Sequence, residues 1–311
     1  KNSGGAERSK IAVWERARDS GLFFSHLIFR LKQHIGSTDF KEKNMSSFAL
    51  KITALILMLL DHIYQFLNFT SVIPIWFTWL GRLSAPIFYF CMAQGLTYTH
   101  SRKAYLLRMY LFSIAMTIGN LTLTTLLPNA PSGGIPNNIF ASLLLGAAII
   151  VCMEEIAKDR QKGQLIWMYF IGIELAGFFI GDMLTRAGQT AAAQILQIFV
   201  PTPLTVEGGI FFVILGPLFY YFRLSKKKMA AMYLVFSLGL CLSSSIAWYA
   251  LGMSAWDAFF GIQYQWMMVF ALPILWCYNG KKGKFSFKYL FYLFYPLHIW
   301  ALYMLSTQLP Q

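Results

Sequence analysis

A polytopic bundle of transmembrane α-helices is the fold class that this sequence predicts. Of its 311 residues, 57% are hydrophobic and 13% are charged, and this charged share is about half that of an average soluble protein. Apolar runs recur from residue 48 to the C-terminal end, and many approach the roughly 20 residues that a helix needs to cross a bilayer. The chain is therefore expected to be all-α, with nine or ten membrane spans.

The boundaries of the individual spans follow from these apolar runs. Residues 190–201 are apolar but too short to cross a bilayer, so this segment is expected to lie at the interface or to re-enter the membrane. The nine predicted spans are residues 49–68, 73–97, 104–127, 137–154, 164–183, 207–223, 229–251, 264–279 and 286–307.

The loops between the predicted spans differ sharply in charge. Of the 26 Lys and Arg residues, 24 lie in residues 1–51 or near positions 102, 160, 226 and 284, whereas only Arg186 falls in a loop on the other side. An excess of cations marks the cytoplasmic loops of membrane proteins. The N-terminus is therefore expected in the cytoplasm, and the net charge of +13 needs no nucleic-acid partner to explain it.

Residues 1–44 differ from the remainder because they carry many charges of both signs. Apolar residues recur there at helical spacing, which predicts a short amphipathic helix on the inner membrane surface. Met45 also fits a natural start, in which case the preceding segment is an extension of little functional weight. Either way, a cytoplasmic extension of residues 1–44 precedes a transmembrane domain of residues 45–311. The apolar stripe consists of Phe24, Leu27, Ile28, Leu31 and Ile35.

Lys51 and His62 are the most informative polar residues of the first span. They are eleven residues apart, so they lie on one face of the helix, about 16 Å apart along its axis. Ionisable side chains deep in a membrane are costly to place and usually functional. His62 is therefore interpreted as a general base, against the alternatives of a metal ligand or a histidine satisfied by a neighbouring helix.

Other buried polar residues are expected to pair across helices. Asp61 points about 100° away from His62, and Arg82 in the second span reaches a similar depth, which predicts an ion pair between Asp61 and Arg82. His298 in the last span matches the depth of His62. This position has two interpretations: His298 shares a polar centre with His62, or it forms a hydrogen bond with the backbone carbonyl that Pro296 leaves without a partner.

Polar residues at the two membrane faces suggest further sites. The Gly-rich basic loop of residues 279–283 is of the kind that wraps phosphate groups. The alternative is that its lysines only set the orientation of the chain in the membrane. On the outer side, Glu207 begins a span, where it is expected to cap the helix or to contact a ligand. Glu174 lies in mid-span without an evident partner, and the four cysteines lack metal-ligand spacing. The cations of the cytoplasmic rim include Lys51, Arg108, Lys281 and Lys282.

Five blocks of the sequence carry a resemblance to a known family. They are Leu59-Leu60-Asp61-His62-Ile63, Gly81-Arg82-Leu83-Ser84-Ala85-Pro86, Asn138-Ile139-Phe140, Tyr278-Asn279-Gly280-Lys281-Lys282-Gly283 and Tyr295-Pro296-Leu297-His298. From about residue 46 to 305 the chain resembles the TraX family of bacterial membrane proteins, whose founding member acetylates the N-terminus of a pilin. The first span is also similar to that of membrane O-acyltransferases that acetylate surface sugars, where a basic residue precedes a catalytic His at the spacing of Lys51 and His62.

The resemblance implies an acyltransferase in the bacterial plasma membrane. Acetyl-CoA would supply the acyl group from the cytoplasm, with no metal, and a hydroxyl or amine acceptor would receive it near the outer leaflet. The acceptor would be a surface glycan, a peptide or a pilin-like protein, and Arg82 or Asn138 would stabilise the oxyanion. The implied residues are His62, His298, Arg82 and Asp61 for catalysis, Lys51, Arg108, Asn279, Lys281 and Lys282 for the cofactor, and Asn138, Glu207 and Tyr295 for the acceptor.

A transporter or flippase is the alternative function for this chain. In that case His62, Arg82 and Glu174 would line the path of the transported molecule. Transporters often contain internal repeats, and the sequence shows none, which favours the acyltransferase. A noncatalytic membrane assembly factor is a third class, and it would not need the spacing of Lys51 and His62.

Overall fold

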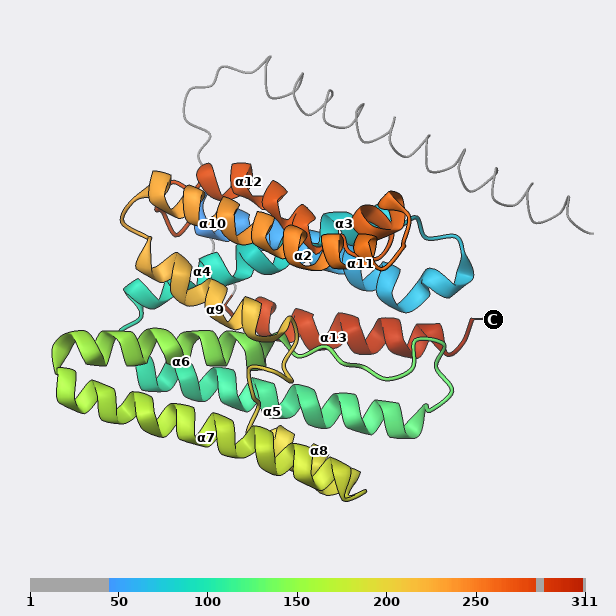
Figure 1. Cartoon of the computed structure of the whole chain (residues 1–311), viewed down its shortest axis with the longest axis horizontal. Coiled ribbons are helices and arrows are strands. Elements are labelled where there is room, and N and C mark those ends of the chain that lie inside the picture. Colours follow the sequence, from blue (N-terminus) through green and yellow to red (C-terminus); the bar gives the residue numbers. More distant parts are fainter. Residues whose placement is uncertain (1–44, 284–287, 310–311) are drawn as a thin grey trace, which may run out of the picture. The chain divides into compact units, whose positions relative to one another are not determined.

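The computed structural model describes residues 45–283 and 288–309, which form helices joined by loops (Figure 1). Residues 1–44, with their predicted amphipathic helix, lie outside the described residues, and the domain boundary at residue 45 stays a prediction. The helices are α2 (Ser47–Leu67), η1 (Asn68–Thr70), α3 (Trp76–Gly81), α4 (Ser84–Tyr98), α5 (Arg102–Leu126), α6 (Ile139–Lys158), α7 (Arg160–Arg186), α8 (Thr190–Phe199), α9 (Gly209–Tyr221), α10 (Lys226–Leu240), η2 (Cys241–Ser245), α11 (Ile246–Ala250), η3 (Asp257–Gly261), η4 (Gln265–Ala271), α12 (Leu272–Trp276) and α13 (Lys288–Ser306).

Five of the described helical segments are long and apolar enough to cross a membrane. The all-helical, membrane-type architecture is therefore confirmed in outline, whereas the exact number of spans and the side on which the N-terminus lies stay predictions. The five segments are Ser47–Thr70, Arg102–Leu126, Ile139–Lys158, Arg160–Arg186 and Lys226–Ala250.

Polar residues that begin the long helices explain where several of them start. The Ser46, Ser101 and Asn138 side chains accept hydrogen bonds from backbone N–H groups in the first turns of α2, α5 and α6. Asp159 ends α6 and caps α7 in the same way. This tight hairpin requires Gly163, because a Cβ there would overlap the backbone at the end of α6. Capping of this kind supplies partners for N–H groups that the helix itself leaves unpaired.

Two predicted spans are less regular than continuous helices. The segment predicted at 73–97 is divided into α3 and α4, because Pro86 lacks the N–H that would bond the Arg82 carbonyl. Pro86 is tolerated in the first turn of α4, where N–H groups have no partner within the helix. The segment predicted at 264–279 consists of the 3₁₀ helix η4 followed by the five-residue α12. The first of these breaks places Arg82 at a helix end that faces α2.

The packing of the helices brings the first and last spans of the described chain together. Helix α2 packs against α3, α4 and α13, and α6 packs against α5, α7 and α9; α5, α6 and α7 run side by side in Figure 1. Buried aromatic residues such as Phe66, Tyr233 and Tyr303 fill the core. The short α8, predicted as an interfacial or re-entrant piece, packs against α7 and α5. Contact between α2 and α13 positions the polar residues described below.

The predicted topology can be tested by labelling introduced cysteines in intact cells. Asn129→Cys and Ala255→Cys lie at exposed positions on the predicted outer side, whereas the exposed Lys227 lies on the predicted cytoplasmic side. A membrane-impermeant thiol reagent should label the first two variants and leave Lys227→Cys unlabelled until the cells are opened. The background is a chain whose four native cysteines are replaced by Ala. Labelling of Lys227→Cys in intact cells would invert the topology.

Candidate active site

His62 and His298 form a hydrogen-bonded pair across α2 and α13. Both residues are buried, and His62 Nδ1 lies 2.7 Å from His298 Nε2. The rings stack with their centroids 4.9 Å apart. The sequence predicted that the two histidines reach the same depth, and the structure places them in direct contact. Together they form the shared polar centre that was one of the two interpretations of His298.

The second nitrogen of His298 determines how the protons are arranged along this pair. His298 Nδ1 lies 2.6 Å from the Phe294 carbonyl, one helical turn earlier, so it must donate. In a neutral His298, Nε2 is then an acceptor, and His62 Nδ1 donates to it. The hydrogen-bond network therefore assigns the lone pair of neutral His62 to Nε2. Pro296 has no N–H group, so it leaves the carbonyl of Tyr292 without its helical partner. His298 bonds the carbonyl of Phe294 and not that of Tyr292, which differs from the alternative interpretation of His298.

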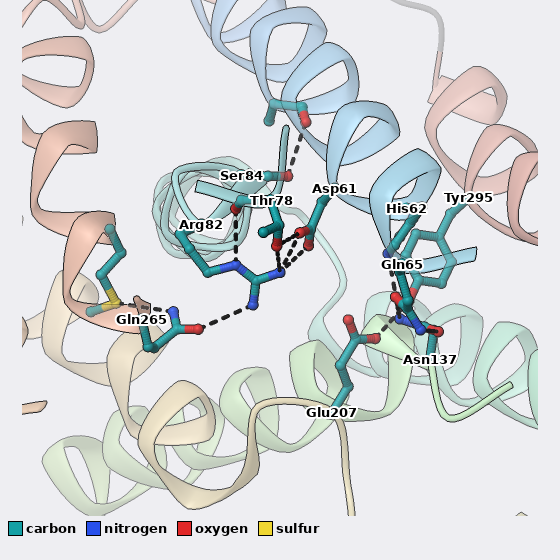
Figure 2. Close-up of polar contacts among 12 residues, drawn as sticks. Asp61, His62, Gln65, Thr78, Arg82, Ser84, Asn137, Glu207, Gln265 and Tyr295 are labelled. Atoms are coloured by element: carbon teal, nitrogen blue, oxygen red, sulfur yellow. Dashed lines mark hydrogen bonds and ion pairs between the residues drawn. The ribbon is translucent and has the colours of Figure 1, made fainter. Parts of the chain in front are cut away.

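An amide side chain that the sequence did not single out, that of Asn137, contacts His62 Nε2. Asn137 Nδ2 lies 3.4 Å from His62 Nε2. Asn137 and Gln65 also exchange two hydrogen bonds with each other, of 2.8 and 3.1 Å (Figure 2). The sequence drew attention to the adjacent Asn138 instead. Asn138 caps α6 through Ala141 N–H and donates to Thr117, so it does not contact His62.

Glu207 and Tyr295 form the opposite edge of this polar centre. The Tyr295 hydroxyl donates to Glu207 Oε2 at 2.6 Å and accepts from Ile139 N–H at 3.1 Å. Tyr295 also packs edge-on against His62, with the ring centroids 6.0 Å apart. Glu207 lies before α9, whose N-cap residue Gly208 supplies no side-chain bond. The Glu207 carboxylate turns toward Tyr295 (Figure 2), and the expectation that it caps the helix stays a prediction.

Asp61 and Arg82 form the predicted ion pair between α2 and the break after α3. Arg82 Nη2 donates to the Asp61 carboxylate, which also accepts from the Thr78 hydroxyl at 2.6 Å. Arg82 Nη1 reaches Gln265 Oε1 at 3.2 Å, so the guanidinium also contacts η4 (Figure 2). A Cβ at Gly81 would overlap the Asp61 side chain. This glycine therefore permits the close approach of the two helices.

Two cavities meet at Glu207. The smaller one, of about 110 Å³, is lined by His62, Arg82, Tyr295 and Glu207 among others. The larger one, of about 590 Å³, is rich in amides and hydroxyls, and it includes Glu207 and the predicted acceptor residue Asn138. Of the predicted polar residues, Glu174 lines neither cavity; its Oε2 is buried without a hydrogen-bond partner among the described residues. The smaller cavity has room for an acetyl group beside His62, and the larger one for a longer chain.

The predicted phosphate-binding residues gather around the start of α2. Backbone N–H groups of Ser47 and Phe48 donate to the carbonyls of Lys281 and Lys282, at 2.8 and 3.2 Å. Lys51 follows one turn later, with Nζ 5.3 Å from the centroid of the Phe291 ring. Because the loop carbonyls cover the N-terminus of α2, any anion there would be bound by lysine side chains rather than by helix N–H groups.

Two other residues predicted to bind the cofactor have separate roles or partners. The Asn279 side chain accepts from Lys281 N–H at 2.8 Å, which holds the loop in its turn. Arg108, on α5, lies with its guanidinium 6.0 Å from the Tyr105 ring centroid. Its Nε is buried without a hydrogen-bond partner among the described residues.

Comparison with known proteins identifies the family. The family description "TraX protein" matches residues 46–306, which is most of the chain. The chain belongs to the TraX family. Among curated proteins, a probable fimbrial assembly protein FimC, serogroup H1, from Dichelobacter nodosus is 25% identical over 261 residues, covering 82% of this chain and 93% of that protein. No solved structure matches the chain. The family match spans both histidines and both cavities.

The Asp61–Arg82 pair should contribute measurably to the stability of this TraX-family fold. Removing one partner leaves the other charge unpaired, and for buried pairs this lowers the free energy of unfolding by about 3–5 kcal/mol. The Arg82 and Asp61 side chains remain 26% and 16% exposed, respectively, so the lower end of that range is expected for Arg82→Ala. Denaturant unfolding in detergent measures the loss. The exchanged double variant Asp61→Arg/Arg82→Asp should recover part of it, and no recovery would contradict the pairing.

Proposed function

We propose that this protein is an integral membrane acyltransferase of the bacterial inner membrane. It transfers an acetyl group from acetyl-CoA, bound at the cytoplasmic side, to a hydroxyl or amine at the outer side. The observation that carries the proposal is the environment of His62. Its Nδ1 is held by His298, its side chain lines the small cavity, and it lies three helical turns from Lys51 on the same helix. A base with one nitrogen oriented by a hydrogen bond and a second, unprotonated nitrogen is what acyl transfer requires.

In the proposed reaction, the acceptor and the thioester meet in the small cavity. His62 Nε2 takes the proton from the acceptor while the acceptor attacks the thioester carbon. The carbon–sulfur bond then breaks, and the coenzyme leaves as its thiol with the proton from His62. Throughout, His62 Nδ1–H continues to donate to His298, which stabilises the transient imidazolium. The nearby Glu207 carboxylate favours the same positive charge.

The larger cavity is the proposed binding site of the acceptor. Its lining combines amides such as Gln194 and Gln197 with hydroxyls such as Thr124, and Glu207 joins it to the cavity of His62. The Ser132 hydroxyl there is buried without a partner among the described residues, which suits a polar ligand. The Dichelobacter nodosus relative is named as a probable fimbrial assembly protein. On that basis we propose a pilin-like protein as the acceptor.

The rival transporter function receives less support from the geometry. It required His62, Arg82 and Glu174 to line one path. His62 and Arg82 share the small cavity, but Glu174 lies on α7 and lines neither of the two polar cavities. An internal ion pair also engages Arg82. The proposed acyl transfer rests on His62 and His298, which are in direct contact.

Lys51 should bind a phosphate of the coenzyme. Lys51→Ala is expected to weaken acetyl-CoA binding about tenfold or more, since a charge-assisted hydrogen bond contributes about 1.5–3 kcal/mol. Calorimetric titration of the purified protein measures this, and added salt should weaken binding by the parent. Lys227→Ala is the matched control, because it removes an exposed cation from a different helix, α10. If Lys51→Ala and the parent bind acetyl-CoA with equal affinity, Lys51 does not bind the coenzyme and only helps to orient the chain in the membrane.

His62 should be essential for turnover. His62→Gln keeps a polar side chain but cannot accept a proton, so acetyl transfer should fall by about two to four orders of magnitude. Acetyl-CoA binding should remain. His298→Gln should have a smaller effect, because it only disturbs the orientation and tautomer of His62. Transfer is measured with radiolabelled acetyl-CoA in detergent or in membranes. Near-parental transfer by His62→Gln would remove His62 from the mechanism.

A further inference from the structure

Tyr89 lines the cavity of His62, and its hydroxyl is a buried donor without a hydrogen-bond partner among the described residues. Tyr89 lies on α4, is 1% exposed and lines the same cavity of about 110 Å³. Its ring is fixed against Phe212 of α9, with the centroids 5.7 Å apart. Its hydroxyl forms no hydrogen bond among the described residues. Buried hydroxyl groups nearly always find a partner, so this one calls for an explanation.

The other hydroxyl donors around the cavity are already engaged. Ser84 donates to the Ala54 carbonyl at 2.9 Å, and Tyr295 donates to Glu207 at 2.6 Å. The Ser142 hydroxyl lies next to the Tyr89 hydroxyl without a hydrogen bond between them, and its proton goes to the backbone carbonyl of Glu207 at 2.6 Å. Tyr89 is therefore the hydroxyl of this group whose proton remains available to a molecule in the cavity.

Arg82, the donor that the sequence suggested for the oxyanion, is also engaged. Its Nε bonds the Thr78 carbonyl, its Nη1 bonds Gln265 and its Nη2 bonds Asp61. These bonds orient the guanidinium toward Asp61, Thr78 and Gln265 rather than toward a reacting group. Asn138, the other suggested donor, lies in the larger cavity and not in the smaller one.

We propose that Tyr89 is a catalytic residue that donates a hydrogen bond to the carbonyl oxygen of the acyl group, an inference that rests on the proposed function. When the acceptor attacks the thioester carbon, the electron pair of the C=O bond moves to that oxygen and a negative charge develops. The Tyr89 O–H stabilises this charge without transferring its proton. The pair returns as the carbon–sulfur bond breaks, and His62 supplies the proton to the departing sulfur. The unpaired hydroxyl is thus ready before substrate binds.

Tyr89→Phe tests the proposal because it removes only the hydroxyl. Loss of one oxyanion donor typically lowers kcat by about 10²–10³-fold, and this is the expected result, with KM and acetyl-CoA affinity little changed. Because the hydroxyl is unpaired in the free protein, its loss should leave Tm equal or higher. Tyr233→Phe is the matched control. It removes a buried hydroxyl that donates to the Met268 carbonyl away from the cavity, so Tm should fall while kcat holds.

The possible results separate this proposal from the proposed function. If the parent protein neither transfers nor hydrolyses acetyl-CoA, the acyltransferase assignment fails. If the parent is active and Tyr89→Phe retains its kcat, or changes KM alone, Tyr89 is not the oxyanion donor. Should Tyr89→Phe fold poorly, fluorotyrosine incorporated at position 89 replaces it. A more acidic phenol is a stronger donor, so kcat should shift with the degree of fluorination, and no shift would overturn the proposal.

Discussion

Polar groups enclosed by apolar helices must find partners on other helices, and α2 satisfies this constraint on three sides. His62 bonds α13, Asp61 bonds Arg82 after α3, and the first N–H groups of α2 bond the loop of residues 279–283. Adjacent residues on a helix point about 100° apart, so Asp61 and His62 serve two different neighbours. Each bond would be costly to leave unmade inside a membrane. The orientation of α2, and with it the position of His62, follows from these three attachments.

Much of this arrangement was predictable because helical geometry acts over short distances. The spacing of Lys51 and His62 fixes a common face, and matching depths anticipated both the Asp61–Arg82 pair and the approach of His298 to His62. Pro86 carried the signal for the break after α3, since it removes a helical hydrogen bond. The long-range partners were harder to predict. Nothing in the Asn137-Asn138 pair indicates which asparagine caps α6 and which faces His62.

The remaining site residues escaped prediction because their roles depend on tertiary contacts. Gln65 lies one turn after His62 on α2, yet its role depends on two hydrogen bonds with Asn137, which lies in the loop before α6. Tyr89 reads as one more aromatic residue in an apolar helix, and only the structure reveals that its hydroxyl is unpaired. Glu207 was expected to follow the helix dipole, but a hydrogen bond from Tyr295 offers its carboxylate a more specific partner. Local sequence rules cannot rank such competing partners.

The histidine pair also suits a reaction in which charge must appear and disappear without rearrangement. His62 Nδ1 carries a proton whether the ring is neutral or cationic, so its bond to His298 Nε2 persists in both states. His298 is held in turn by the Phe294 carbonyl, a backbone group that does not titrate. Donors and acceptors that already point in the required direction need no reorganisation when charge develops. Under the proposed mechanism, the proton moves only at Nε2.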